Sequence, residues 1–492
     1  MKKGFFRTIA LSVMMLATVG TVSAQKDYEY KPVDPELQTM AQQVIEQQLS
    51  DPDAANKTFS KLMKKLGKDK DELMTMGKFF LDKKIYPCAN MIAKQLYTAD
   101  PTFIPGLMFN GEVCMLRKAY GEAGQKFDEV LAIDSTYTPA LRRNAFVYKN
   151  INPHVAIEML QKIKNIEPSN FEADKELGDI YYGLEDYDNA IKYYKTYDAA
   201  ITNKSTIDFR SAENYMLSLF AKQKFVEIST LVPQYLEAMP DSMKNKQDKV
   251  FKSLKFYADV ENYELDKAKA DMEYITSKAY PDSVYNYRDY TYASGLMKEL
   301  NDIPSAISYM EQAIKSDPSK PAAYKELASL YRENKQTDEG LATYRKYIGI
   351  LGDKAEMTDM FGLVFQYQAA AQDSATTAAQ KAQYIKEGNA ICDTIIAHKP
   401  DAYQAYLLKA RINIKGNNPD DNVKALYEQA LQHMEGKENT QTAKIEALRY
   451  LTYYFVQKEN NAEARKYCDE ILKLEPENAF AKQVDGYLKA AQ

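Results

Sequence analysis

The chain has 492 residues, of which 45% are hydrophobic and 27% charged, and its formal net charge is −5. This composition is ordinary for a globular protein, excludes collagen-like chains, and predicts several domains or one extended array. Acidic and basic residues are interspersed, which disfavours nucleic acid as a partner, because phosphate binding needs clustered lysine and arginine.

The start of the chain, 1–24, has the features of a secretory signal peptide. Lys2, Lys3 and Arg7 precede an apolar run over 9–19, and small residues lead up to Ala24. We expect cleavage after Ala24, which removes three positive charges and changes the net charge from −5 to −8. No later segment approaches the ~20 apolar residues of a spanning helix, so we expect no transmembrane segment after cleavage. The expected location is the periplasm, with secretion as the alternative.

A polar segment, 25–35, follows and contains two prolines without a helical period, which predicts a flexible lead-in. A helical pattern then begins, and it is clearest where Ala190, Tyr194 and Tyr197 form the buried face of one helix. Gly178 lies within the preceding helix, where glycine costs about 1 kcal/mol relative to alanine. This cost predicts a packing reason: with Ala190 opposite Gly178, we expect the two helices to approach closely and tyrosines to fill the space around that contact.

The small residue of this pattern recurs along the chain at a nearly constant interval of about 34 residues. The period and the residue types resemble the tetratricopeptide repeat family. The resemblance implies helical hairpins that stack into a right-handed α-α superhelix, because one hairpin cannot bury its apolar face alone. The recurring residues are Ala55, Ala89, Ala123, Ala156 and Ala190.

The repeats predict how the chain is organised. We expect a regular array over 36–204, degenerate hairpins over 205–286 and a second array over 287–478. About fourteen extra residues around 369–382 predict either longer helices or a loop in that second array. The last stretch, 479–492, is typical of a capping helix with a polar outer face. The expected fold class is therefore all-α, with about twelve hairpins and a capping helix.

The usual signatures of catalysis are missing from the sequence. The three histidines are isolated, and no H-E-x-x-H, G-x-S-x-G, P-loop or G-x-G-x-x-G motif occurs. We therefore expect no enzymatic activity, no cofactor and no metal site.

Four cysteines remain to be explained. Cys88 and Cys114 are equally far from Pro101 along the chain, on helices that we expect to be adjacent and antiparallel. They should lie at about the same level, which predicts a disulfide in an oxidising compartment. Cys392 and Cys468 occupy apolar repeat positions two hairpins apart, so we expect buried thiols there.

Tyrosine is abundant, with 38 residues, whereas tryptophan is absent. Many tyrosines occupy repeated core positions. A local cluster exceeds what core packing needs, and exposed contact residues and core packing both remain open for it. Its members are Tyr280, Tyr285, Tyr287, Tyr290 and Tyr292.

The resemblance to tetratricopeptide repeats implies a scaffold that binds a protein or peptide of the cell envelope along a concave groove. A glycan- or small-ligand-binding solenoid for nutrient uptake is the alternative, and the absence of tryptophan for sugar stacking weighs against it. An enzyme with an unrecognised site is a more distant third.

In the family, first helices line the groove, and some members hold a partner's terminal carboxylate with a lysine and an asparagine. Lys175 and Lys325 occupy the place of that lysine, but Asp179 and Ser329 stand where the asparagine would be. We expect a mildly basic and polar partner-binding set. Its members are Arg142, Lys175, Asp179, Tyr182, Arg288, Lys325, Ser329 and Arg332.

Overall fold

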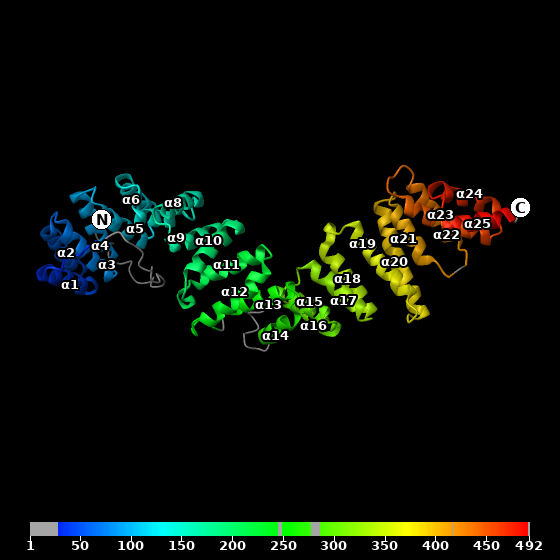
Figure 1. The fold of residues 1–492 in the computed structure, drawn as a ribbon, viewed down its shortest axis with the longest axis horizontal. Coiled ribbons are helices and arrows are strands. Elements are labelled where there is room, and N and C mark those ends of the chain that lie inside the picture. Colours follow the sequence, from blue (N-terminus) through cyan, green and yellow to red (C-terminus); the bar gives the residue numbers. More distant parts are fainter. Residues whose placement is uncertain (1–27, 245–247, 277–285, 417, 491–492) are drawn as a thin grey trace. The chain divides into compact units, whose positions relative to one another are not determined.

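The computed structural model describes residues 28–244, 248–276, 286–416 and 418–490. This part of the chain contains 25 α-helices and no strand, so the predicted all-α helical solenoid is confirmed (Figure 1). The predicted signal peptide, 1–24, lies outside the described residues. Among the helices that are described, none is both long enough and apolar enough to cross a membrane.

The chain divides into two compact units, 1–262 and 263–492. The helices of the first unit are α1 (Pro35–Ser50), α2 (Pro52–Leu66), α3 (Lys70–Asp82), α4 (Tyr86–Ala99), α5 (Ile104–Leu116), α6 (Tyr120–Ile133), α7 (Thr138–Tyr148), α8 (Pro153–Ile166), α9 (Phe171–Gly183), α10 (Tyr187–Ala200), η1 (Lys204–Thr206), α11 (Phe209–Ala221), α12 (Phe225–Ala238) and α13 (Asp248–Glu261). Consecutive helices pair as hairpins from α1–α2 to α11–α12, and from α4 to α12 each second helix packs against the first helix of the next pair.

The second unit is built in the same way. Its helices are α14 (Leu265–Thr276), α15 (Tyr287–Glu299), α16 (Ile303–Ser316), α17 (Pro321–Glu333), α18 (Thr337–Leu351), η3 (Gly352–Lys354), α19 (Met357–Gln372), α20 (Ala378–His398), α21 (Tyr403–Asn413), α22 (Asp421–His433), α23 (Gln441–Gln457), α24 (Asn461–Leu474) and α25 (Ala479–Ala490). The hairpins run from α15–α16 to α23–α24, and α25 packs on α24 with Leu488 buried. The extra residues around 369–382 extend α19 and α20, which are 16 and 21 residues long, and supply the short connection between them.

The hairpin of α9 and α10 shows why these sequences form helix pairs. The side chain of Asn170 caps the start of α9, and that of Asp186 caps α10 by accepting the N–H of Asn189. Ala190 and Leu177 are completely buried between the helices. The same burial applies to all five alanines that define the period (Ala55, Ala89, Ala123, Ala156 and Ala190), each of which has an exposed fraction of 0%.

The contact made by Gly178 differs from the one expected. A Cβ atom at this position would lie 2.6 Å from Cδ1 and 3.0 Å from Cγ of the Tyr194 ring, which is its nearest neighbour. Glycine therefore makes room for a buried tyrosine ring rather than for a close approach to Ala190. The ring is held in place, because the Tyr194 hydroxyl donates a 2.7 Å hydrogen bond to Asp179.

This packing predicts that Gly178→Ala destabilises the protein. Alanine favours the helix by about 1 kcal/mol, but overpacking beside a fixed ring costs about 3 kcal/mol, so we expect a net loss of about 2 kcal/mol. Gly183→Ala is the matched control in the same helix, because no atom lies within 4 Å of a Cβ there. Urea unfolding followed by circular dichroism compares the variants, and a Gly178→Ala chain more stable than wild type would contradict the packing role.

Candidate partner-binding face

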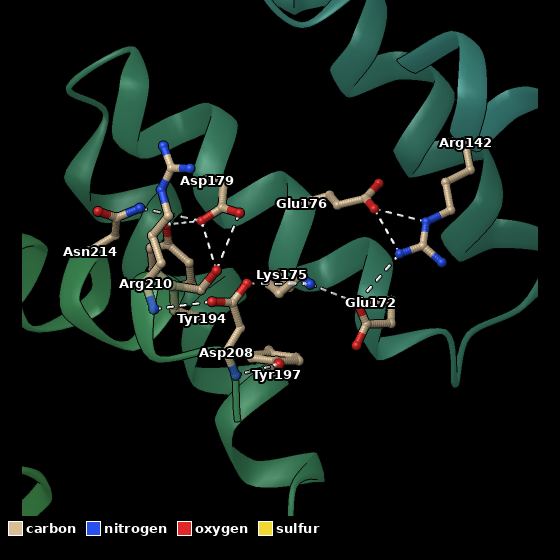
Figure 2. A network of polar contacts seen from close by, with 11 residues as sticks. Arg142, Glu172, Lys175, Glu176, Asp179, Tyr194, Tyr197, Asp208, Arg210 and Asn214 are labelled. Atoms are coloured by element: carbon tan, nitrogen blue, oxygen red, sulfur yellow. Dashed lines mark hydrogen bonds and ion pairs between the residues drawn. The ribbon is translucent and has the colours of Figure 1, made fainter. Parts of the chain in front are cut away.

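Four predicted partner-binding residues belong to two successive first helices of the first unit, Arg142 to α7 and Lys175, Asp179 and Tyr182 to α9. Figure 2 shows the first three. We call the exposed and half-buried side chains on the first helices of the hairpins the first-helix face; in this part of the chain it is formed by α7, α9 and α11. Arg142 of α7 donates from Nε to Glu176 Oε1 of α9 at 2.8 Å, and from Nη2 to Glu172 Oε2 at 3.4 Å. The guanidinium thus joins one hairpin to the next.

Lys175 of α9 continues the network toward α11. Its Nζ atom lies 2.9 Å from Glu172 Oε2 and 3.6 Å from Asp208 Oδ2, and 6.0 Å from the centre of the Tyr197 ring. Burial alone would lower the pKa of Lys175, but the hydrogen bond and charge of Glu172, together with Asp208 and Tyr197, outweigh burial and raise that pKa. The ammonium therefore stays charged, with only 19% of the side chain exposed.

Asp179 is an anchor between three helices. Its carboxylate accepts hydrogen bonds from Tyr194 Oη at 2.7 Å, Ser211 Oγ at 3.1 Å and Asn214 Nδ2 at 3.4 Å (Figure 2). Burial raises the pKa of Asp179, and these hydrogen bonds partly offset that rise. The Asp179 carboxylate is therefore bound by donors of the protein itself, from α10 and α11. Tyr182, one turn along α9, is half-buried, and its ring centre lies 6.2 Å from that of Tyr187.

The other four predicted residues belong to the second unit. Lys325 of α17 has a 55% exposed side chain, and its Nζ lies 3.6 Å from Asp359 Oδ1 of α19. Ser329 accepts a 3.3 Å hydrogen bond from Arg332 Nη2. Arg332 and Arg288, on α17 and α15, are exposed. Lys325 and Ser329 thus contact acidic and basic neighbours on the same kind of face as in the first unit.

The acidic residues that pair with Arg142, Lys175 and Lys325 were not identified from the sequence. A usable signal existed, because opposite charges one repeat apart lie opposite each other on successive first helices. Arg142 pairs with Glu176 at a separation of 34 residues, and Lys325 pairs with Asp359. The other missed groups are Glu172, Asp208, Ser211 and Asn214.

The predicted disulfide is not formed. Cys88 and Cys114 are free, buried thiols. Cys88 packs in the core formed by α1 to α5, whereas Cys114 belongs to the core around Phe127 and lies 3.7 Å from Asn110 Oδ1. Although the two cysteines are equally far from Pro101 along the chain, their side chains point into different core clusters and do not meet.

The structure also describes the other two cysteines and three tyrosines of the cluster. Cys392 and Cys468 are buried, as predicted, and burial raises the pKa of Cys392 to about 12, so that thiol stays protonated. In the tyrosine cluster, Tyr287, Tyr290 and Tyr292 of α15 are half-buried. Tyr280 and Tyr285 lie outside the described residues.

Within the described part of the chain, no group of three or more histidine, cysteine or acidic side chains is arranged to hold a metal ion.

Comparison with known families agrees with the repeated hairpins. Models of the tetratricopeptide repeat match residues 176–198 in the first unit and 298–355 in the second. The chain is a tetratricopeptide repeat protein. The first match covers most of α9 and α10, which contribute Asp179 and Tyr194 to the network; the second covers α17, which contributes Lys325. No curated protein matches the chain.

Several solved structures are similar to this tetratricopeptide repeat protein. The C-terminal part of a repeat-containing protein from Cytophaga hutchinsonii is 19% identical, with a TM-score of 0.42, over 56% of this chain and 99% of the other. A tetratricopeptide repeat protein from Parabacteroides merdae is 17% identical, with a TM-score of 0.34, over 54% and 99%. MamA is 23% identical, with a TM-score of 0.28, over 30% and 87%.

Proposed function

We propose that this protein is a non-catalytic scaffold that binds a protein or peptide partner through the first-helix face of its repeats. The observation that carries the proposal is the network across α7, α9 and α11. Arg142 of α7 is held by Glu172 and Glu176 of α9, and Lys175 is held by Glu172 of its own helix and by Asp208 at the start of α11, while 20% and 19% of the two side chains stay exposed. Charges held in position lose little conformational entropy when a ligand binds.

An extended segment suits this face better than a compact small molecule. The polar side chains are spread over several hairpins, and an extended peptide or a helix can contact several hairpins at once. Tetratricopeptide repeats are typically such non-catalytic scaffolds. We further propose that the partner belongs to the cell envelope and that the protein works in the periplasm, on the basis of the predicted signal peptide.

Photo-crosslinking in the native cell tests the proposal. We would place benzoylphenylalanine at Tyr182 of α9 and at Arg332 of α17, and at matched exposed positions on the second helices of the same hairpins, Lys195 and Lys346. We expect protein adducts from positions 182 and 332 but not from 195 and 346. Mass spectrometry of the adducts then identifies the partner.

Two outcomes would contradict the scaffold. Equal adducts from both helices of a hairpin would mean that the first-helix face has no special role. No protein adduct at any position, together with binding of purified protein to envelope glycans, would support the glycan- or small-ligand-binding alternative instead.

A further inference from the structure

The segment before α1 lies on α3 and makes specific contacts with it. Tyr28 Oη donates a 2.5 Å hydrogen bond to Asp71 Oδ1, and Lys31 Nζ lies 2.5 Å from Asp71 Oδ2. One carboxylate therefore binds two side chains that are three residues apart. The segment has no helical structure from Tyr28 to Asp34.

The backbone and the apolar side chains of this segment make further contacts with the repeats. Thr75 Oγ1 donates to the carbonyl oxygen of Lys31 at 3.3 Å. The Tyr28 ring packs edge-on against Phe103, at the start of α5, with 6.0 Å between ring centres. Val33 packs against the core beneath. The segment is thus recognised through side chains, a backbone carbonyl and apolar contact.

The contacted side of α3 corresponds to the first-helix face. Asp71 and Thr75 stand at the repeat positions of Glu172 and Glu176, in the register that aligns Gly77 with Gly178. In the later repeat, Glu172 and Glu176 receive the guanidinium of Arg142 from the preceding first helix.

The first helix before α3 is α1, just as α7 is the first helix before α9. At the repeat position that Arg142 occupies in α7, α1 has a methionine. Met40 of α1 stands one repeat before Met74 of α3, and both occupy the repeat position of Arg142. Met40 packs against the core. Lys31 of the segment therefore provides Asp71 with the positive charge that a preceding first helix provides to Glu172.

We propose that the first-helix face at α3 is a peptide-binding site that the chain fills with its own residues 28–33. The site takes an extended peptide in which a tyrosine hydroxyl and a lysine ammonium, three residues apart, reach the carboxylate of Asp71. This inference rests on the proposed function and narrows it, because it names the chemistry of a ligand that this part of the face accepts.

The tether explains how the site stays filled. A segment joined to its site by a short connection acts at an effective concentration of roughly millimolar. A free peptide at micromolar concentration therefore cannot displace it. A competing ligand must be bound more tightly than the segment, or must contact more hairpins.

Peptide binding to the full-length chain tests the proposal. The probe is a fluorescein-labelled peptide of residues 28–34, YEYKPVD, followed by fluorescence anisotropy. We expect the double variant Tyr28→Ala, Lys31→Ala to bind this peptide at least about tenfold more tightly than wild type, because its own segment no longer competes. Adding Asp71→Asn to the double variant should abolish the gain.

A matched control removes an exposed tyrosine and lysine elsewhere in the same unit. Tyr120→Ala, Lys149→Ala should bind the peptide no better than wild type. A second measurement needs only one substitution: Asp71→Asn in the otherwise native chain should speed chymotrypsin cleavage after Tyr28 and Tyr30 at least about tenfold, because release of the segment exposes it.

The proposal is overturned if the double variant and wild type bind the peptide equally, or if Asp71→Asn changes neither binding nor cleavage. These results leave the scaffold function standing when Tyr182 and Arg332 still give partner adducts. Loss of those adducts with intact peptide binding at α3 would instead refute the scaffold function along α9 and α17.

Discussion

The helical signal of this protein is expected to fall cooperatively as the pH rises from about 10 to about 12, because many tyrosines are neutral hydrogen-bond donors to carboxylates. Tyr384 donates to Asp338 at 2.6 Å, and Tyr454 donates to Asp421 at 2.6 Å. Burial and the Asp338 hydrogen bond raise the pKa of Tyr384 to about 12. The Asp421 hydrogen bond and burial raise the pKa of Tyr454 to about 12.

The direction of the effect follows from these pKa values. A folded-state pKa above the ordinary 10 means that the unfolded chain loses the phenol proton first. The contribution is therefore fully present below about pH 10 and is lost as the pH rises toward about 12. Burial, together with the charge of a neighbouring carboxylate, likewise raises the pKa of Tyr194, Tyr235 and Tyr427, so the effect is shared by both units.

Absorbance at about 295 nm measures tyrosine ionisation directly, because the chain has 38 tyrosines and no tryptophan. We expect part of the signal to appear only together with the loss of helix. The chain unfolded in guanidinium is the reference, and there all tyrosines should titrate as one set. Complete ionisation near the ordinary pKa in a chain that keeps its helices would show the prediction to be wrong.

Lysine also loses its charge in this pH range, so a tyrosine variant is needed to separate the causes. Tyr454→Phe should be less stable than wild type at about pH 8, where it lacks the bond to Asp421, and the deficit should shrink or reverse at about pH 11. Phe361→Leu is the control, because it removes no ionisable group and Phe361 packs against apolar side chains of α19, α20 and α21. Its effect on the free energy of unfolding should be the same at both pH values.

Asp179→Ala is expected to lower the free energy of unfolding by about 2–4 kcal/mol, because it leaves several buried donors without an acceptor. Asp179 accepts hydrogen bonds from Tyr194 of α10 and from Ser211 and Asn214 of α11. Ser211 and the Tyr194 side chain are almost fully buried. The substitution thus disconnects α9 from α10 and α11 at one point.

Hydrogen exchange with mass spectrometry locates this effect. Amides of α9 to α11 should exchange about 10- to 100-fold faster in Asp179→Ala, while those of α21 to α24 in the other unit stay unchanged as an internal control. Ser329→Ala is the comparison at the corresponding position of the second unit. Among the described residues, its hydroxyl is bonded to Arg332 and Glu333 of the same helix, so we expect a change within about 0.5 kcal/mol. Equal effects of the two variants would contradict the anchoring role of Asp179.

Much of the candidate face was predictable from the sequence, and part of it was not. The repeat positions identified Arg142, Lys175 and Asp179 as side chains of the same helix face, because register within a helix is local. Some of their partners come from neighbouring hairpins, as Glu176 does for Arg142 and Ser211 does for Asp179. Glu176, one repeat after Arg142, was accessible to a search for opposite charges, whereas the three-way anchoring of Asp179 depends on how α10 and α11 pack on α9.

The turns show the same division between local and tertiary information. Glu185 and Lys335 lie between the helices of their hairpins with φ of 59° and 60°. No glycine marks either position, although left-handed backbone costs an ordinary residue about 1–2 kcal/mol. The helices on both sides hold these residues in that conformation, so the sequence of the turn alone does not indicate it.

The sequence by itself determined the all-α repeat architecture, because the regular hydrophobic period can be read directly from the order of Ala123, Ala156 and Ala190. Only the tertiary structure decided which groups meet across that architecture. It placed Tyr194 rather than Ala190 against Gly178, kept Cys88 and Cys114 as separate thiols, and set residues 28–33 on α3. The physical reason is that a repeat pattern specifies which face of each helix is buried, whereas contacts between helices also depend on the size and direction of side chains from distant parts of the chain.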